Sequence, residues 1–104
     1  MSKRIIKNER IKAIIHDIAQ DFRFSQETGE YALLFYKVDA QGVVKGAEID
    51  QMVTYLTTGL DELRDNMKWR REFLNDNPQI DEIRMLENLG VIEEEYIELL
   101  KFLA

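Results

Sequence analysis

Apolar residues recur along residues 47–75 with the spacing of one long helix. The steps alternate between four and three residues, through Ile49, Val53, Leu56, Leu60, Leu63, Met67, Arg70 and Leu74. A mean period near 3.5 residues places these side chains on one face, as in a helix that packs lengthwise against another. At about 1.5 Å per residue the segment would be roughly 43 Å long. We therefore predict a long central helix that needs a partner helix, from this chain or from a second copy.

Gly59 lies near the middle of that segment, where a glycine costs roughly 1 kcal/mol relative to alanine. It either permits the close approach of another backbone or marks a kink that splits the helix in two, and we expect the continuous helix. A clearer break follows at residues 76–78, because Asn77 can cap a helix and Pro78 fits a first helical position.

The flanking segments predict shorter elements. Residues 3–22 show helical spacing of isoleucines and end in a polar turn at residues 25–29. Residues 31–38 are dense in aromatic and branched side chains, which favours a strand, and residues 43–45 would return as its partner. Asp39 and Gly42 supply the turn between them.

Residues 78–104 predict a helical hairpin with Gly90 as the left-handed cap of its first helix. The fold class is therefore mainly α. We expect a helical domain of about four helices with a long central helix, a small β-hairpin near residues 31–45 and a C-terminal helical hairpin. Residues 1–104 would form this single domain, because no linker or repeat divides them.

Composition narrows the range of functions. With no cysteine and one histidine, the chain offers no disulfide, thiolate nucleophile or multi-histidine site. Its five glycines are scattered, so no phosphate-binding loop is present, and neither of its two serines lies in a nucleophile elbow. We expect no enzyme, catalytic residue, cofactor or metal site. No apolar run approaches the ~18 residues of a membrane span, and we expect a cytoplasmic protein without membrane partners.

Residues 35–49 resemble an EF-hand loop. Gly42 matches the turn glycine of that family, Val44 the central apolar position and Glu48 the final carboxylate, while Asp39 and Gln41 match oxygen-bearing positions. The resemblance implies a calcium loop between two helices. However, Lys37 occupies the first ligand position, where its charge would repel calcium, and we expect no calcium site.

Residues 80–103 are similar to the short bihelical domains at the carboxyl ends of many bacterial proteins. The similarity lies in Gly90-Val91-Ile92-Glu93-Glu94-Glu95-Tyr96, which matches a glycine, a branched pair, acids and an aromatic residue. The capping Thr or Ser of that family is missing here. The resemblance implies two helices joined at the glycine and an association with oligomerisation.

Our leading hypothesis is a small acidic helical protein that binds a protein partner as an adaptor, regulator or inhibitor. By analogy, such a protein suits a phage or mobile element. Aromatic residues, methionine and arginine are enriched at the centres of protein interfaces. The candidate partner-binding residues are therefore Trp69, Arg70, Phe73, Tyr55 and Met67. Alternatively, Trp69 and Phe73 are core residues, and Arg70 reaches past the apolar seam to meet a carboxylate. We also expect self-association, with a dimer favoured.

Uneven charge leaves two alternatives open. The net charge is −6, yet residues 1–12 carry five basic residues and one acid, whereas residues 79–104 carry seven acids and two basic residues. A nucleic-acid-binding accessory protein would use the basic residues Lys3, Arg4, Lys7, Arg10, Lys68 and Arg71 on phosphates. An acidic mimic of nucleic acid would instead use its C-terminal acids to inhibit a DNA- or RNA-binding protein.

Overall fold

A computed structural model describes residues 3–76 and 79–104. Within them the chain forms β1 (Lys3–Ile5), α1 (Glu9–Phe24), α2 (Glu30–Gln41), β2 (Val43–Lys45), α3 (Gly46–Asp76) and α4 (Ile80–Leu103). The mainly α class is confirmed, with four helices in the described residues, a small antiparallel pair of strands and a C-terminal pair of helices. The predicted break at Asn77 and Pro78 lies outside the described residues.

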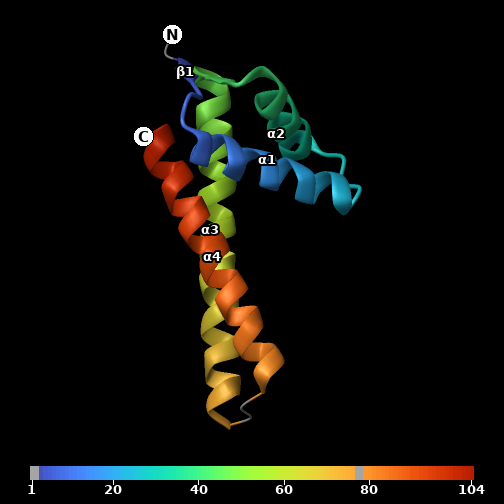
Figure 1. The fold of residues 1–104 in the computed structure, drawn as a ribbon, viewed down its shortest axis with the longest axis vertical. Helices are drawn as coiled ribbons and strands as arrows, with labels where there is room; N and C mark the ends of the chain where they lie inside the picture. The colour runs from blue at the N-terminus through green and yellow to red at the C-terminus, as the bar shows by residue number, and fades with distance from the viewer. Residues whose placement is uncertain (1–2, 77–78) are drawn as a thin grey trace.

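The molecule is elongated, with extents of 51 × 28 × 23 Å. Figure 1 shows α3 and α4 running antiparallel along the long axis, with α1 and α2 packed beside them at the end that holds both termini. We call that end the head. The tail is the rest of the helical pair, residues 60–76 of α3 and residues 80–92 of α4, and neither α1 nor α2 extends along it (Figure 1).

The prediction of one continuous long helix is confirmed, since α3 runs for 31 residues through Gly59. A Cβ atom at Gly59 would lie 3.1 Å from the ring of Tyr96 on α4, which is tighter than ordinary contact. The glycine therefore permits a close approach, as one of our two interpretations held, although the approaching group is a side chain rather than a backbone.

The head holds the hydrophobic core. Its buried side chains come from all four helices, from β2 and from the segment after β1: Ile6, Ile11, Ile14, Ile15, Ile18, Ala19, Phe22, Ala32, Leu34, Phe35, Val38, Val44, Met52, Leu56, Leu99 and Leu103. Tyr55 joins this core, because its ring centroid lies 5.2–5.6 Å from those of Phe22, Tyr31 and Phe35.

Two boundaries near the amino terminus differ from the prediction. Helix α1 begins at Glu9 rather than at Lys3, because the Asn8 side chain accepts hydrogen bonds from the amides of Arg10 and Ile11 and caps it. The preceding Lys3–Ile5 is a strand, and it pairs antiparallel with β2. The expected strand at residues 43–45 is therefore confirmed, but its partner is β1.

The predicted strand at residues 31–38 is wrong, because this segment lies within α2. Ala32, Phe35 and Val38 are buried at steps of three residues, so they share one face of the helix. The free energy gained by packing this face on the core outweighs the preference of these residues for a strand. Gly42 follows the helix with a φ of 68°, as predicted for a positive-φ turn position, and its amide bonds the carbonyl of Val38.

The predicted stop at Gly90 is also wrong, because α4 continues unbroken from Ile80 to Leu103. The hairpin at the carboxyl-terminal end is formed by α3 and α4 instead. Packing against α3 outweighs the roughly 1 kcal/mol that an internal glycine costs. One of the contacts just beyond Gly90 is an ion pair of 3.0 Å between Arg64 Nε and Glu93 Oε2.

The segment that resembles an EF-hand has a helix, a left-handed glycine, a short strand and a second helix in that order. Its final carboxylate, Glu48, is buried and accepts the amide of Lys45, in the manner of a helix-capping glutamate. Lys37 Nζ lies 3.0 Å from Glu48 Oε2. An ammonium group from the chain itself thus neutralises the carboxylate that the family would offer to calcium.

Replacing Gly59 with leucine is expected to lower the free energy of unfolding by about 1–3 kcal/mol, because the side chain would collide with the Tyr96 ring. Leucine is the better helix former, so helix propensity cannot cause the loss. Urea unfolding followed by circular dichroism measures it. Thr57→Leu, at an exposed position of the same turn, is the control and should stay within about 0.5 kcal/mol of the parent. Equal stability of the two variants would contradict the role of Gly59.

Glu48→Ala is expected to cost about 1–2 kcal/mol at pH 7 through loss of the α3 cap. Burial raises the pKa of Glu48, but hydrogen bonds from the Lys45 amide and Lys37 outweigh it and hold the pKa below the ordinary 4.5. A lowered pKa stabilises the fold above the unfolded-state pKa, and this contribution is lost as the pH falls through the folded-state pKa. Urea titrations from pH 7 to 3 should therefore show the deficit of Glu48→Ala shrinking below pH 4.5, whereas a constant deficit would contradict the assignment.

Candidate docking face

The tail exposes many large apolar side chains. Its two helices bury Leu60 and Met67, but a pair of helices has no third layer to cover its outer surfaces. The exposed apolar residues of the tail are Trp69, Phe73, Ile80, Ile83, Met85, Val91 and Ile92. Exposed apolar side chains concentrated in one part of a molecule are typical of a site of interaction.

Two surface hollows identify the side of the helical pair that is left uncovered in the tail. One of about 440 Å³ lies between α1 and the α3–α4 pair, where Tyr55, Ile92 and Tyr96 line it. The next, of about 480 Å³, shares these three residues and extends along α3 to Asn66. The side that α1 and α2 cover in the head therefore continues, uncovered, onto the tail.

Helix geometry extends this side farther down the tail. Residues seven apart lie two turns apart on nearly the same line of a helix, so Trp69 lies below Glu62, and Phe73 lies below Asn66. On α4, Met85 lies two turns from Ile92 by the same rule. Glu62, Asn66 and Ile92 line the second hollow. We define the open face by these six residues: Glu62, Asn66, Trp69, Phe73, Met85 and Ile92.

The open face is largely apolar. Trp69 is 62% exposed, Met85 is 42% exposed, and Phe73 and Ile92 are each 37% exposed. The rings of Trp69 and Phe73 stack with centroids 5.9 Å apart and planes 19° from parallel. Stacking holds the two rings in one orientation, so an incoming surface would meet a partly ordered aromatic pair.

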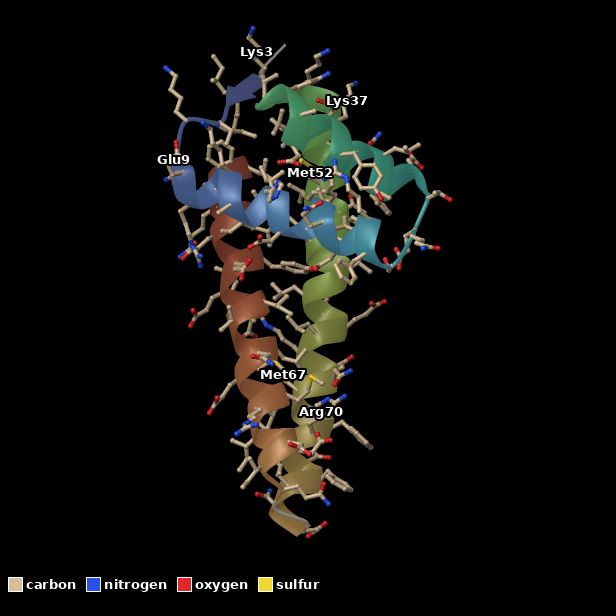
Figure 2. The ribbon with its side chains drawn as sticks, turned by 45° about the vertical axis from the view of Figure 1, so that its right-hand side comes forward. Lys3, Glu9, Lys37, Met52, Met67 and Arg70 are labelled. Carbon is tan, nitrogen blue, oxygen red and sulfur yellow. The ribbon has the colours of Figure 1, made fainter. Side chains whose placement is uncertain are left out.

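The other predicted partner-binding residues make contacts within the chain. Arg70 reaches across to α4, where Nη1 lies 2.7 Å from Glu82 Oε2, and its Nε donates to Asn66 Oδ1 at 2.6 Å. The interpretation that Arg70 passes the seam to meet a carboxylate is therefore confirmed. Met67 is 4% exposed, in the seam between α3 and α4 (Figure 2).

Tyr55, the fifth predicted residue, is half-buried in the aromatic cluster of the head. Burial raises the pKa of its hydroxyl strongly, and the nearby Tyr96, Glu27 and Asp21 raise it further. Burial also raises the pKa of Tyr96. Both phenols therefore remain neutral at physiological pH.

The basic candidates do not form one surface. Figure 2 shows Lys3 at the head end and Arg70 far along the tail, so the amino-terminal set and the Lys68–Arg71 set are well separated. Arg4 Nη2 donates to the carbonyl of Ala104 at 2.6 Å, and Arg10 Nε pairs with Glu98 Oε2 at 2.9 Å. Lys7, Lys68 and Arg71 are exposed.

The described residues contain no group of three or more His, Cys, Asp or Glu side chains arranged to hold a metal ion. None of their helices is both long enough and apolar enough to cross a membrane. No protein-family model, curated protein or solved structure matches this chain.

The sequence analysis identified two of the six residues of the open face, Trp69 and Phe73, and missed the other four. Met85 and Ile92 were not singled out, although their spacing of seven residues was visible in the sequence. Glu62 and Asn66 form a second heptad line with Trp69 and Phe73, beside the apolar stripe. That line was a usable signal for a second contact surface on α3.

Substitutions should separate the interior candidates from the exposed ones. Met67→Ala is expected to lower the free energy of unfolding by about 2–4 kcal/mol, because it leaves a cavity in the seam. Trp69→Ala should cost at most about 1 kcal/mol, since its ring is mostly exposed and loses mainly the stacking with Phe73. Urea unfolding by circular dichroism tests both, and a larger loss for Trp69→Ala would show that the tryptophan is structural.

Proposed function

We propose that this protein is a non-enzymatic binding protein, an adaptor, regulator or inhibitor, that docks a protein partner on the open face of its tail. The observation that supports this most directly is the stacked pair of Trp69 and Phe73, on the same side as Met85 and Ile92. Burying exposed apolar side chains against a partner is favourable, by about 25 cal/mol for each Å² removed from water.

The division into head and tail supports the proposal. The head contains nearly all of the fully buried residues, so it accounts for most of the apolar burial that stabilises the fold. The exposed apolar side chains of the tail contribute little to the stability of the free chain. A bound partner would bury them and gain the free energy of that burial. Tryptophan is among the residues most enriched at the energetic centres of interfaces.

A second copy of this chain is the rival occupant. A two-fold dimer would place the open face against itself, so its partners would be the same six residues. The dimer expected from the sequence remains a prediction, and light scattering decides it by distinguishing a particle of 12.3 kDa, the mass of one chain, from one of twice that mass.

Paired substitutions test the docking face. Partner proteins would be captured with this chain from an extract of the cells that encode it, identified by mass spectrometry, purified and titrated by calorimetry. The double substitution Trp69→Ala with Phe73→Ala should weaken binding at least tenfold, because it removes the aromatic anchors.

The matched control is Lys68→Ala with Arg71→Ala, which removes two exposed side chains from the same part of α3. This pair should change the affinity by less than threefold. Weak binding in the control with normal binding in the aromatic variant would overturn the proposal and favour an electrostatic surface, as in the nucleic-acid alternative.

A further inference from the structure

The two hollows beside α1 are lined by acidic residues. Asp17, Asp21, Glu27 and Glu95 line the first, and Glu62 lines the second. No described Lys, Arg or His lines either one. None of the five carboxylates forms an ion pair with another described residue. Negative charge therefore accumulates at the end of the open face nearest the head without an ion pair to any of these carboxylates among the described residues.

The charge around Glu95 shows the effect of this crowding. Burial raises the pKa of Glu95, and the negative charge of Asp17 raises it further. Arg10 offsets part of the rise, but its own ion pair is with Glu98. A cation brought to this place would relieve repulsion that the free chain tolerates.

The floor between these carboxylates is formed by aromatic and aliphatic side chains. Tyr55, Tyr96 and Ile92 line both hollows, and the Tyr96 ring packs against Gly59. From Tyr55, which lines both hollows, to Phe73, the hollows and the open face together follow α3 for 18 residues, or about 27 Å at ~1.5 Å per residue. This length suits a helix of about five turns lying along the groove of a helical pair.

We propose that the open face takes an amphipathic helix of a partner protein whose apolar stripe is flanked by Lys and Arg. The inference rests on the proposed docking function and adds the chemistry of the partner. The apolar stripe would cover Trp69, Phe73 and Ile92, while the basic flanks would meet the five carboxylates.

Charge also weighs against two other occupants. A second copy would bring the acid-lined hollows against another acidic chain, and like charges brought together across an interface reduce affinity. A nucleic acid would bring phosphates to the same carboxylates. Both occupants are outcomes of the test rather than parts of the proposal.

The probes are three synthetic helical peptides of 18 residues without tryptophan. The first has a leucine stripe flanked by lysines, the second replaces each lysine with glutamate, and the third is a scrambled cationic peptide without a stripe. Trp69 is the only tryptophan of the chain, so its fluorescence reports binding at the open face directly. We expect the first peptide to bind at least tenfold more tightly than either of the others.

A matched pair of variants excludes general attraction to an acidic protein. Asp17→Asn, Glu62→Gln and Glu95→Gln together remove three charges from the hollows, and should weaken binding of the cationic peptide about tenfold. Asp50→Asn, Glu87→Gln and Glu94→Gln remove three charges from exposed positions that do not line the hollows. This control should change binding less than threefold.

The outcomes separate the two proposals. Equal weakening by both triple variants, equal affinity for the cationic and anionic peptides, or no binding of any peptide would overturn the basic-helix inference. If the cationic and anionic peptides bind the parent chain equally well and Ile92→Asp abolishes binding of both, the docking face stands and the charge preference fails. If Ile92→Asp leaves binding unchanged while circular dichroism shows a folded chain, the docking face itself is wrong.

Discussion

The packing of α3 against α4 is the interaction on which the rest of the structure depends. Three contacts at successive levels along the pair hold the two helices together. Gly59 packs against the Tyr96 ring, Arg64 forms an ion pair with Glu93 at 3.0 Å, and Arg70 forms one with Glu82 at 2.7 Å. The first contact lies at the boundary between head and tail. Because both helices continue through that boundary, the well-packed head orients a tail that could not stabilise itself alone.

A pair of helices is an incomplete layer structure. Each helix buries a single stripe against the other, and a stable domain covers the remaining apolar surface with a further layer. In the head, α1 and α2 provide that layer over Tyr55 and Tyr96. In the tail no element of residues 3–76 and 79–104 provides it, although Ile92 and Met85 continue the same side. The open face is therefore a surface that the fold itself prepares but does not cover.

Much of this could be predicted from the sequence, because a long heptad stripe of apolar residues is compatible with few structures other than a long helix packed against another helix. The continuity of α3, its need for a partner helix and the contact of Arg70 with a carboxylate all follow from residue spacing. Residues 31–38 and Gly90 could not be assigned in the same way. Their local preferences favour a strand and a break, whereas packing against residues distant in the sequence decides for helix in both places.

The position of the docking face depends on how α3 is rotated about its axis, which the sequence of α3 alone does not determine. Trp69 and Phe73 are visible in the sequence as an aromatic pair, but whether they face α4, solvent or the continuation of the α1 side depends on how α3 is rotated. That rotation is set in the head, where Met52 and Leu56 enter the core. Helical phase then transmits it along α3 to the tail, so the rigidity of one helix links core packing to the surface offered to a partner. A kink at Gly59 would break this link, which explains why a continuous helix matters more here than its own stability.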